Sequence, residues 1–80
     1  MAKFEGVYLE WEDAVAEADW GEVTEAGLFK CKTLGFVVSE NDKAICVAAV
    51  VSEEDSQCNA KIHIPKAWIT AEKRLNMDDQ

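Results

Sequence analysis

The sequence has few basic residues, a single histidine, a single proline and no long apolar run. Eight Lys and Arg stand against sixteen Asp and Glu, so the 80 residues carry a formal net charge of −8. This charge repels phosphate backbones and anionic membrane surfaces, and we expect nucleic acid to be an unfavourable partner. No apolar run approaches the roughly 18 residues of a membrane helix, and no secretory signal pattern opens the chain. We expect a cytoplasmic protein that does not bind membranes.

Cysteine is scarce and odd in number. Cys31, Cys46 and Cys58 cannot all pair, and the first two lie inside apolar runs, so we expect reduced thiols. Zinc ligands usually come as pairs two to four residues apart, whereas these cysteines and His63 are separated by 15, 12 and 5 positions. The spacing predicts no metal site, and no motif predicts a cofactor.

The chain has a single histidine, which argues against catalysis by an activated nucleophile. His63 is the one imidazole that could activate a nucleophile. Cys58 lies five positions away on the same predicted strand, and an odd separation places two side chains on opposite faces. We therefore expect no catalytic residue and no enzymatic activity. One hypothesis of catalysis stays open beside the binding functions considered below: an enzyme that pairs Cys58 or a carboxylate with His63. It is called the third hypothesis from here on.

What the sequence does contain is a series of short strand patterns. Val7, Leu9 and Trp11 alternate with polar residues, which is typical of a half-buried strand. Similar patterns predict strands at residues 28–38, 44–51 and 58–64, with polar turns at residues 39–43 and 52–57. Gly35 is expected to let the second strand bend, so that one strand serves two halves of the sheet.

Two stretches break the strand pattern. Residues 13–27 have glycines at positions 21 and 27 and no period-two alternation, which predicts a long irregular loop with room for a short helix. Pro65 removes a ladder donor, so residues 64–69 are expected to form one tight helical turn before a short strand at residues 68–70. Residues 71–80 are polar, and we expect a frayed tail.

These elements predict a mainly β domain at residues 1–70: a small five-stranded SH3-like barrel, with a long loop after the first strand and a one-turn helix before the last. The segment Ile64-Pro65-Lys66-Ala67-Trp68-Ile69 resembles the Ile-Pro-x-x-Tyr-Val segment of SH3 domains. The tyrosine-rich acidic opening and the paired tryptophans of that family are missing. Binding of polyproline peptides is therefore not expected.

The region before the second strand is acidic and contains an unexpected tryptophan. Eight carboxylates precede that strand, with Lys3 as the one basic residue among them. Acidic side chains beside an exposed tryptophan are typical of interface hot spots, and the hypothetical partner-binding residues are Glu17, Asp19, Trp20, Glu22 and Trp68. Two simpler interpretations stay open: a solvated acidic surface, and Trp20 folded back as a lid over one end of the barrel.

Four segments occur in the order Leu9-Glu10-Trp11-Glu12-Asp13, Cys31-Lys32-Thr33-Leu34-Gly35-Phe36-Val37-Val38, Asp42-Lys43-Ala44-Ile45-Cys46-Val47-Ala48 and residues 64–69. Over most of the chain, this order resembles that of small uncharacterised proteins of tailed bacteriophages and prophages. The resemblance implies an accessory protein in the bacterial cytoplasm that binds and modulates a host or phage protein with a basic surface.

Two alternative functions remain. One is a small barrel that binds a nucleotide or oligonucleotide through Lys30, Lys32, Lys61 and Lys66. The other is a structural phage protein that forms homo-oligomers.

Overall fold

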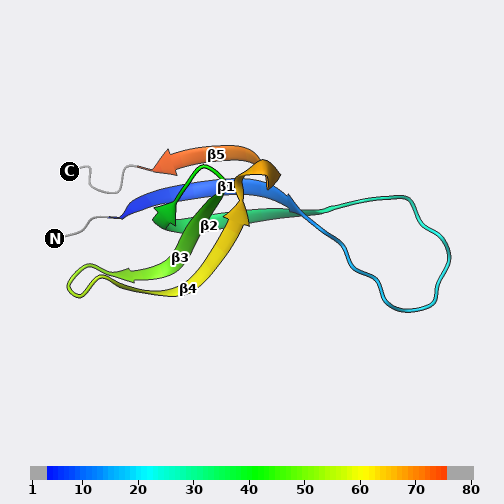
Figure 1. The fold of residues 1–80 in the computed structure, drawn as a ribbon, viewed down its shortest axis with the longest axis horizontal. Helices are drawn as coiled ribbons and strands as arrows, with labels where there is room; N and C mark the ends of the chain where they lie inside the picture. The colour runs from blue at the N-terminus through cyan, green and yellow to red at the C-terminus, as the bar shows by residue number, and fades with distance from the viewer. Residues whose placement is uncertain (1–3, 76–80) are drawn as a thin grey trace.

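The computed structural model describes residues 4–75, which form a mainly β structure (Figure 1). In chain order the elements are β1 (Glu5–Asp13), β2 (Phe29–Glu40), β3 (Ala44–Ser52), β4 (Gln57–Pro65), the 3₁₀ helix η1 (Lys66–Trp68) and β5 (Ile69–Leu75). The expectation of a mainly β chain is confirmed.

The five strands form one antiparallel sheet in the order β4-β3-β2-β1-β5. Strands β1 to β4 therefore lie beside one another in chain order, and β5 pairs with the free edge of β1. No hydrogen-bonded ladder joins β5 to β4 in the described part of the chain, so closure of the sheet into a barrel is not detected.

Strand β2 belongs to both halves of the sheet, as the sequence predicts. It pairs with β1 from Phe29 to Val37 and with β3 only from Phe36 to Glu40. Gly35 comes just before the part of β2 that has partners on both sides. A Cβ atom there would lie 2.6 Å from the carbonyl oxygen of Ala48, so glycine permits this close approach of β2 to β3.

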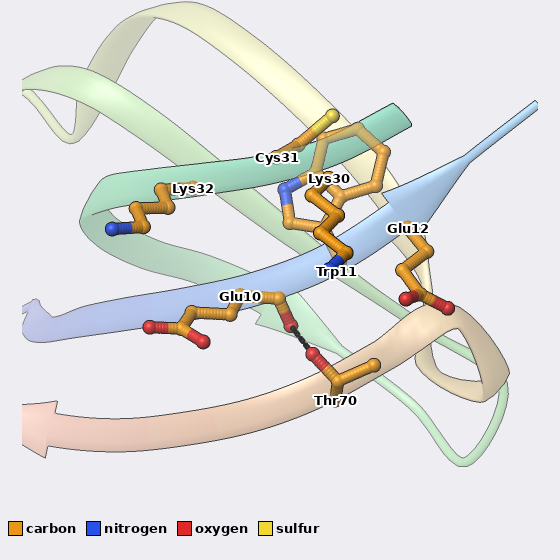
Figure 2. A pocket seen from close by; sticks show the side chains of 7 residues that line it. All are labelled: Glu10, Trp11, Glu12, Lys30, Cys31, Lys32 and Thr70. Carbon is orange, nitrogen blue, oxygen red and sulfur yellow. Dashed lines mark hydrogen bonds between the residues drawn. The ribbon is translucent and has the colours of Figure 1, made fainter. Parts of the chain in front are cut away.

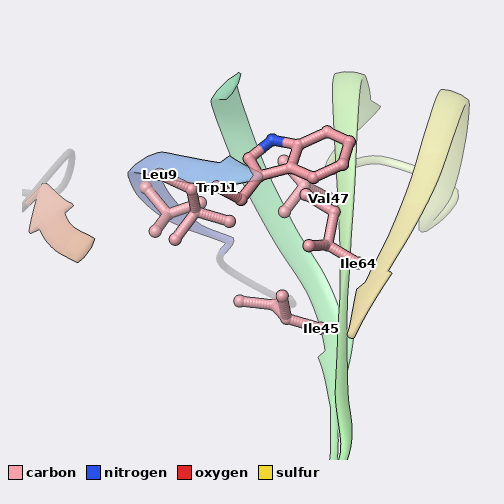
Figure 3. Close-up of a cluster of buried hydrophobic side chains, with 6 residues drawn as sticks. Leu9, Trp11, Ile45, Val47 and Ile64 are labelled. Carbon is pink, nitrogen blue, oxygen red and sulfur yellow. The ribbon is translucent and has the colours of Figure 1, made fainter. Parts of the chain in front are cut away.

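The hydrophobic core lies between the two halves of the sheet. Figure 3 shows Leu9 and Trp11 of β1 pointing toward Ile45 and Val47 of β3 and toward Ile64 of β4. The buried core cluster consists of Val7, Leu9, Trp11, Ile45, Val47 and Ile64, with Cys31, Val37 and Ile69 packed against it. The alternating residues of β1 thus face inward as predicted.

Local turn chemistry explains the β2–β3 connection and the start of η1. The Asn41 side-chain oxygen accepts the backbone N–H groups of Lys43 at 2.8 Å and Ala44 at 2.9 Å, which fixes the turn. Pro65 ends β4, and the next backbone N–H, that of Lys66, donates to the carbonyl of Lys43 at 2.8 Å. The chain then makes the single helical turn predicted from Pro65.

Two predictions about the remaining segments are corrected. The last strand was expected to stop at residue 70, but it continues to Leu75 because the backbone of residues 71–75 pairs with β1. The predicted tail is shorter for this reason, and its residues 76–80 lie outside the described residues. Residues 14–28 contain no helical turn, so the short helix allowed in the loop does not form. In residues 4–75 no helix has the length and apolarity to cross a membrane.

Candidate functional site

The main candidate site is a long connection between β1 and β2, residues 14–28, which we call the acidic segment. The last pair of the β1–β2 ladder is Asp13 with Phe29, and the chain between them leaves the sheet. Figure 1 shows the segment as a wide loop that extends far from the strands. Neither of the two backbone hydrogen bonds found outside the ladders of the described residues involves it.

The composition of the acidic segment explains why it does not pack against the sheet. It contains Glu17, Asp19, Glu22 and Glu25 and no basic residue. Like charges along one chain repel each other and favour an extended course. Every residue of the segment is exposed, including all four carboxylates.

Large apolar side chains are also exposed on this acidic segment. Trp20 is 103% exposed and Val23 is 101% exposed, so none of residues 4–75 covers either side chain. The interpretation of Trp20 as a lid over the sheet is therefore wrong. Leu28 and Phe29, at the base of the segment, are each more than half exposed. An isolated exposed apolar residue is ordinary, whereas tryptophan is enriched among the residues that contribute most of the binding energy at protein interfaces.

The two arms of the acidic segment face each other across a shallow hollow of about 460 Å³. Its lining residues are Val15, Glu17, Thr24, Glu25, Ala26, Gly27, Leu28 and Phe29. The hollow therefore combines apolar side chains with two carboxylates, Glu17 and Glu25.

Trp68, the fifth predicted site residue, is held apart from the other four. Its ring stacks on Trp11 with a centroid distance of 6.4 Å and an interplanar angle of 17°. The Trp11 indole N–H in turn donates to the Thr33 hydroxyl at 2.9 Å. Trp68 thus packs on the core residue Trp11 of β1, although 41% of its surface is exposed. Since Trp11 lies two residues before the end of β1, Trp68 lies toward the base of the acidic segment.

A second hollow, of about 260 Å³, lies over β1, β2 and the start of β5 (Figure 2). Its lining residues are Glu10, Trp11, Glu12, Lys30, Cys31, Lys32 and Thr70. The sheet register places Lys32 opposite Glu10 and Lys30 opposite Glu12, so the charges alternate in sign across the strands. The Thr70 hydroxyl donates to the Glu10 carbonyl at 3.1 Å and joins β5 to β1 here.

The four lysines proposed for nucleotide binding do not form a single basic surface. Lys30 and Lys32 face glutamates across the β1–β2 ladder. Lys66 forms an ion pair with Glu40, with 2.9 Å between Nζ and Oε1. Lys61 is exposed on β4, opposite Ala48 of β3.

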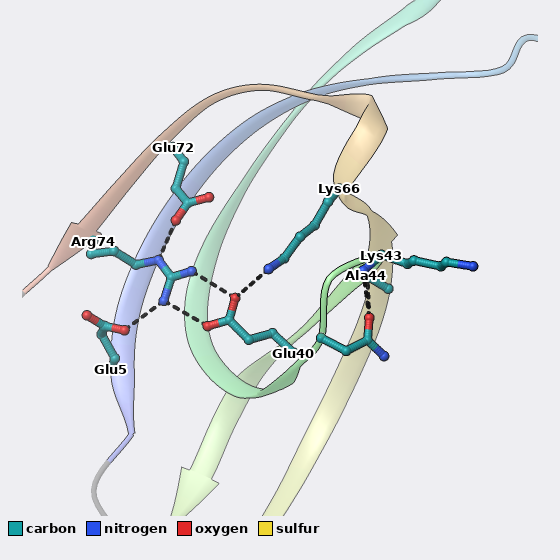
Figure 4. A network of polar contacts seen from close by, with 8 residues as sticks. Glu5, Glu40, Lys43, Ala44, Lys66, Glu72 and Arg74 are labelled. Atoms are coloured by element: carbon teal, nitrogen blue, oxygen red, sulfur yellow. Dashed lines mark hydrogen bonds and ion pairs between the residues drawn. The ribbon is translucent and has the colours of Figure 1, made fainter.

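A network of ion pairs around Arg74 connects β5 with β1 and the end of β2 (Figure 4). The Arg74 guanidinium contacts Glu5 at 2.7 Å, Glu72 at 2.5 Å and Glu40 at 3.1 Å. Hydrogen bonds from Arg74 and then Lys66 lower the pKa of Glu40 from 4.5 to about 2. Hydrogen bonds to Glu40, and then to Glu5 and Glu72, raise the pKa of Arg74. The network ties together segments 34 and 69 residues apart.

His63, the residue on which the third hypothesis of an enzyme depends, has a neighbouring cysteine that spacing along the chain did not indicate. The β3–β4 register places Cys58 opposite Val51 and His63 opposite Cys46. A small hollow adjoins His63, but the thiol that lines it is Cys46 and not Cys58. Counting outward from the predicted turn at residues 52–57 would have paired Cys46 with His63. Among the described residues, no three His, Cys, Asp or Glu side chains are grouped to hold a metal ion.

Comparison of the chain with protein-family models, with curated proteins and with solved structures gives no match. The proposal that follows rests on the residues and their geometry.

Proposed function

We propose that this chain is a small, non-enzymatic binding domain that presents its acidic segment to a basic surface of a partner protein. The observation that carries the proposal is the complete exposure of Trp20 among four carboxylates, on a segment with no basic residue. The five strands serve as the scaffold that holds the two ends of this segment together at Asp13 and Phe29.

The proposal includes an SH3-like barrel as the scaffold. The strand order, a long connection after β1 and a 3₁₀ turn directly before β5 support this assignment. A core enclosed between the two halves of one bent sheet supports it further. Side chains also bridge the halves, because Arg74 of β5 reaches Glu40 at the end of β2.

The energetics of the acidic segment favour binding through Trp20. Burial of a tryptophan removes roughly 150–250 Å² from water, worth about 4–6 kcal/mol before the costs of ordering are subtracted. Carboxylates around such an anchor speed the encounter with a basic surface and exclude acidic ones. Trp20 would supply most of the affinity, and Glu17, Asp19 and Glu22 would supply selectivity.

The biological setting is part of the same proposal. The resemblance to small bacteriophage proteins suggests a partner encoded by the phage or its bacterial host. A basic surface that normally holds an anionic ligand is the kind of target that an acidic, tryptophan-bearing loop can occupy. The nucleotide-binding alternative has less support, since Lys66 is paired with Glu40 and Lys30 and Lys32 face glutamates.

The test is affinity capture from a bacterial lysate with the intact chain as bait. A partner of the proposed kind is retained by the wild type and lost with Trp20→Ala and with the double variant Glu17→Lys/Asp19→Lys. The matched control reverses two charges elsewhere, Glu53→Lys/Glu54→Lys, in the exposed turn between β3 and β4. This control changes the net charge equally and should keep the partner.

Salt provides a second criterion. Exposed charge pairs are screened over about 8 Å at physiological ionic strength, so retention should fall as salt is raised. Capture that is unaffected by Trp20→Ala, or that both double variants weaken equally, would refute the proposed role of the acidic segment.

A further inference from the structure

A shallow hollow lined only by uncharged residues lies at the end of the sheet where β1 begins. Its volume is about 290 Å³, and its lining residues are Gly6, Leu34, Gly35, Phe36, Ala49 and Leu75. Charged residues make up 30% of the chain, and the hollows beside the acidic segment, Lys32 and His63 all contain carboxylates. This hollow therefore differs from those three in having an apolar lining.

The hollow opens on the outer face of the sheet. Val7 and Leu9 of β1 point into the core, and successive side chains of a strand point to opposite faces. Gly6 is therefore on the outer face with its ladder partner Phe36, and so is Leu34, two positions before Phe36. Leu34 is 69% exposed, so most of its side chain reaches into solvent beside the glycine of the hollow. An apolar projection and an apolar depression thus lie next to each other.

The exposed apolar surface continues onto β3. Phe36 is opposite Ala48 in the β2–β3 ladder, which places Ala48 on the outer face as well. Val50 follows two positions later on the same face and is 59% exposed. We call Leu34, Phe36, Val50 and Leu75 the outer apolar face.

Charge is distributed unevenly around the outer apolar face. The cross-strand row that contains Phe36 ends at Lys61 of β4, and the row that contains Leu34 ends at Lys73 of β5. Neither row contains a carboxylate, although the chain has twice as many acidic as basic residues. Two copies of an acidic chain repel each other least where carboxylates are absent. The outer apolar face is therefore a surface at which a second copy can approach.

The acidic segment leaves the sheet from the other end of β1 (Figure 1). Asp13 is seven positions after Gly6, which corresponds to about 23 Å along a strand. Charges in solvent are screened over about 8 Å at physiological ionic strength. The acidic segment consequently adds little repulsion when two copies meet at the outer apolar face.

We propose that the outer apolar face binds the same face of a second copy of this chain. In a two-fold symmetric contact each copy offers the same surface, so Leu34 of each copy enters the hollow of the other. The glycine at position 6 lets the two backbones approach closely there. Interfaces that bury less than about 1,200 Å² are weak and reversible, and four side chains make an interface of this small class. The dimer therefore exchanges with the monomer.

Each copy in such a dimer keeps its acidic segment at the end of β1 away from the shared face. One dimer then displays two acidic segments, which raises the avidity for a partner that has two basic surfaces within reach. This consequence rests on the proposed function, whereas the dimer itself does not.

The experiment is analytical ultracentrifugation of the full, reduced chain at several protein concentrations. We expect a monomer–dimer equilibrium between about 5 and 500 µM, the range of weak interfaces. Leu34→Glu should weaken association about tenfold or more, because the dimer would bury two unpaired carboxylates. Val23→Glu is the matched control: it changes the net charge equally at a fully exposed position and should leave association within about twofold.

Salt provides a second readout that separates this contact from capture of the partner. Raising NaCl from about 50 to about 500 mM should preserve or strengthen the dimer, because salt screens the repulsion between two chains of like charge. Capture through the acidic segment is expected to weaken under the same change. Trp20→Ala should leave the dimer unchanged, so failure of the proposed function and failure of the dimer are distinguishable.

Three results would overturn the proposal. A monomer at every concentration would show that the outer apolar face does not bind a second copy. Equal weakening by Leu34→Glu and Val23→Glu would show that only net charge matters. A dimer that dissociates at high salt would show that ion pairs hold the copies together. Because Leu34 is mostly exposed, an unchanged Tm of the dilute Leu34→Glu variant verifies that its fold is intact.

Discussion

Gly35 is a position at which an added Cβ atom is expected to destabilise the fold. An added Cβ would lie 2.6 Å from the Ala48 carbonyl oxygen and 2.8 Å from Val47 Cγ1, so β2 or β3 must move. We expect Gly35→Ala to lower the free energy of unfolding by about 1–3 kcal/mol, as overpacking does elsewhere. Urea denaturation measures the change.

The two glycines of the acidic segment provide the control for this prediction. Gly21 and Gly27 have no atom within 4 Å of an added Cβ, so their alanine variants should stay within about 0.5 kcal/mol of the wild type. Equal effects at all three positions would show that the close approach at Gly35 is relaxed in solution.

Ala60 is a residue whose backbone suits glycine better than alanine. Its φ of 58° lies in the left-handed region, which costs an L-residue with a Cβ roughly 1–2 kcal/mol. Glycine loses about 0.5–1 kcal/mol more backbone entropy on folding, so Ala60→Gly should stabilise the protein by up to about 1 kcal/mol.

Ala71→Gly is the matched control for Ala60, because Ala71 lies exposed in edge strand β5 and has no positive φ. It should destabilise the protein by about 0.5–1 kcal/mol, and chemical denaturation compares the two. Destabilisation of similar size in both variants would contradict the left-handed conformation of Ala60.

At the scale of elements, the ion pairs of Glu40 predict a dependence of stability on pH. Its pKa is lowered to about 2 in the folded protein, from 4.5, chiefly by hydrogen bonds from Arg74 and Lys66. A carboxyl group with a lowered pKa stabilises the fold above its ordinary pKa, and this stabilisation is lost as pH falls through the folded value. The contribution should therefore be complete above about pH 5 and disappear toward pH 2.

Thermal unfolding of Glu40→Gln between pH 2 and 7 measures this contribution. The variant should have a lower Tm than the wild type at pH 7, and the two should converge near pH 2. Because Glu40 is partly exposed, we expect a modest effect, up to about 1 kcal/mol. Glu54→Gln, in the β3–β4 turn, is the control. A constant difference in Tm at all pH values would exclude the ion pairs as its cause.

The strands themselves could largely be predicted from the sequence, because short-range patterns determine them. Alternation placed Val7, Leu9 and Trp11 in the core, and Pro65 marked the end of β4. Residues 71–75 could not be assigned to β5 in this way. Their sequence is polar since β5 lies at an edge, and only pairing with β1 makes them a strand.

The residue content of the candidate site could be predicted from the sequence, but the positions and exposure of its side chains could not. The acidic, irregular character of the loop and the unusual Trp20 were evident from the sequence. The full exposure of Trp20 and the stacking of Trp68 on Trp11 depend on how the sheet bends. The contact of Cys46 with His63 depends on the register of the β3–β4 ladder, and the separation of the two residues along the chain does not indicate it.

The whole molecule is elongated because the acidic segment and the β3–β4 hairpin extend from the core (Figure 1). Its principal extents are 54 × 23 × 22 Å, and its radius of gyration of 15.8 Å exceeds the roughly 12 Å of a compact domain of this length. Loops this long without secondary structure are uncommon in compact domains, and they are usually either functional or disordered segments. The shape therefore agrees with a scaffold that displays a binding segment.

Shortening the acidic segment tests the division between scaffold and binding element most directly. In this variant a four-residue Gly-Ser linker replaces residues 15–27, and its capture of the partner retained by the wild type is measured beside its Tm. A shorter loop lowers the entropy cost of closure by about 1 kcal/mol, so the fold should be at least as stable. We expect an intact fold that no longer captures the partner, whereas capture equal to that of the wild type would show that the acidic segment is not the binding element.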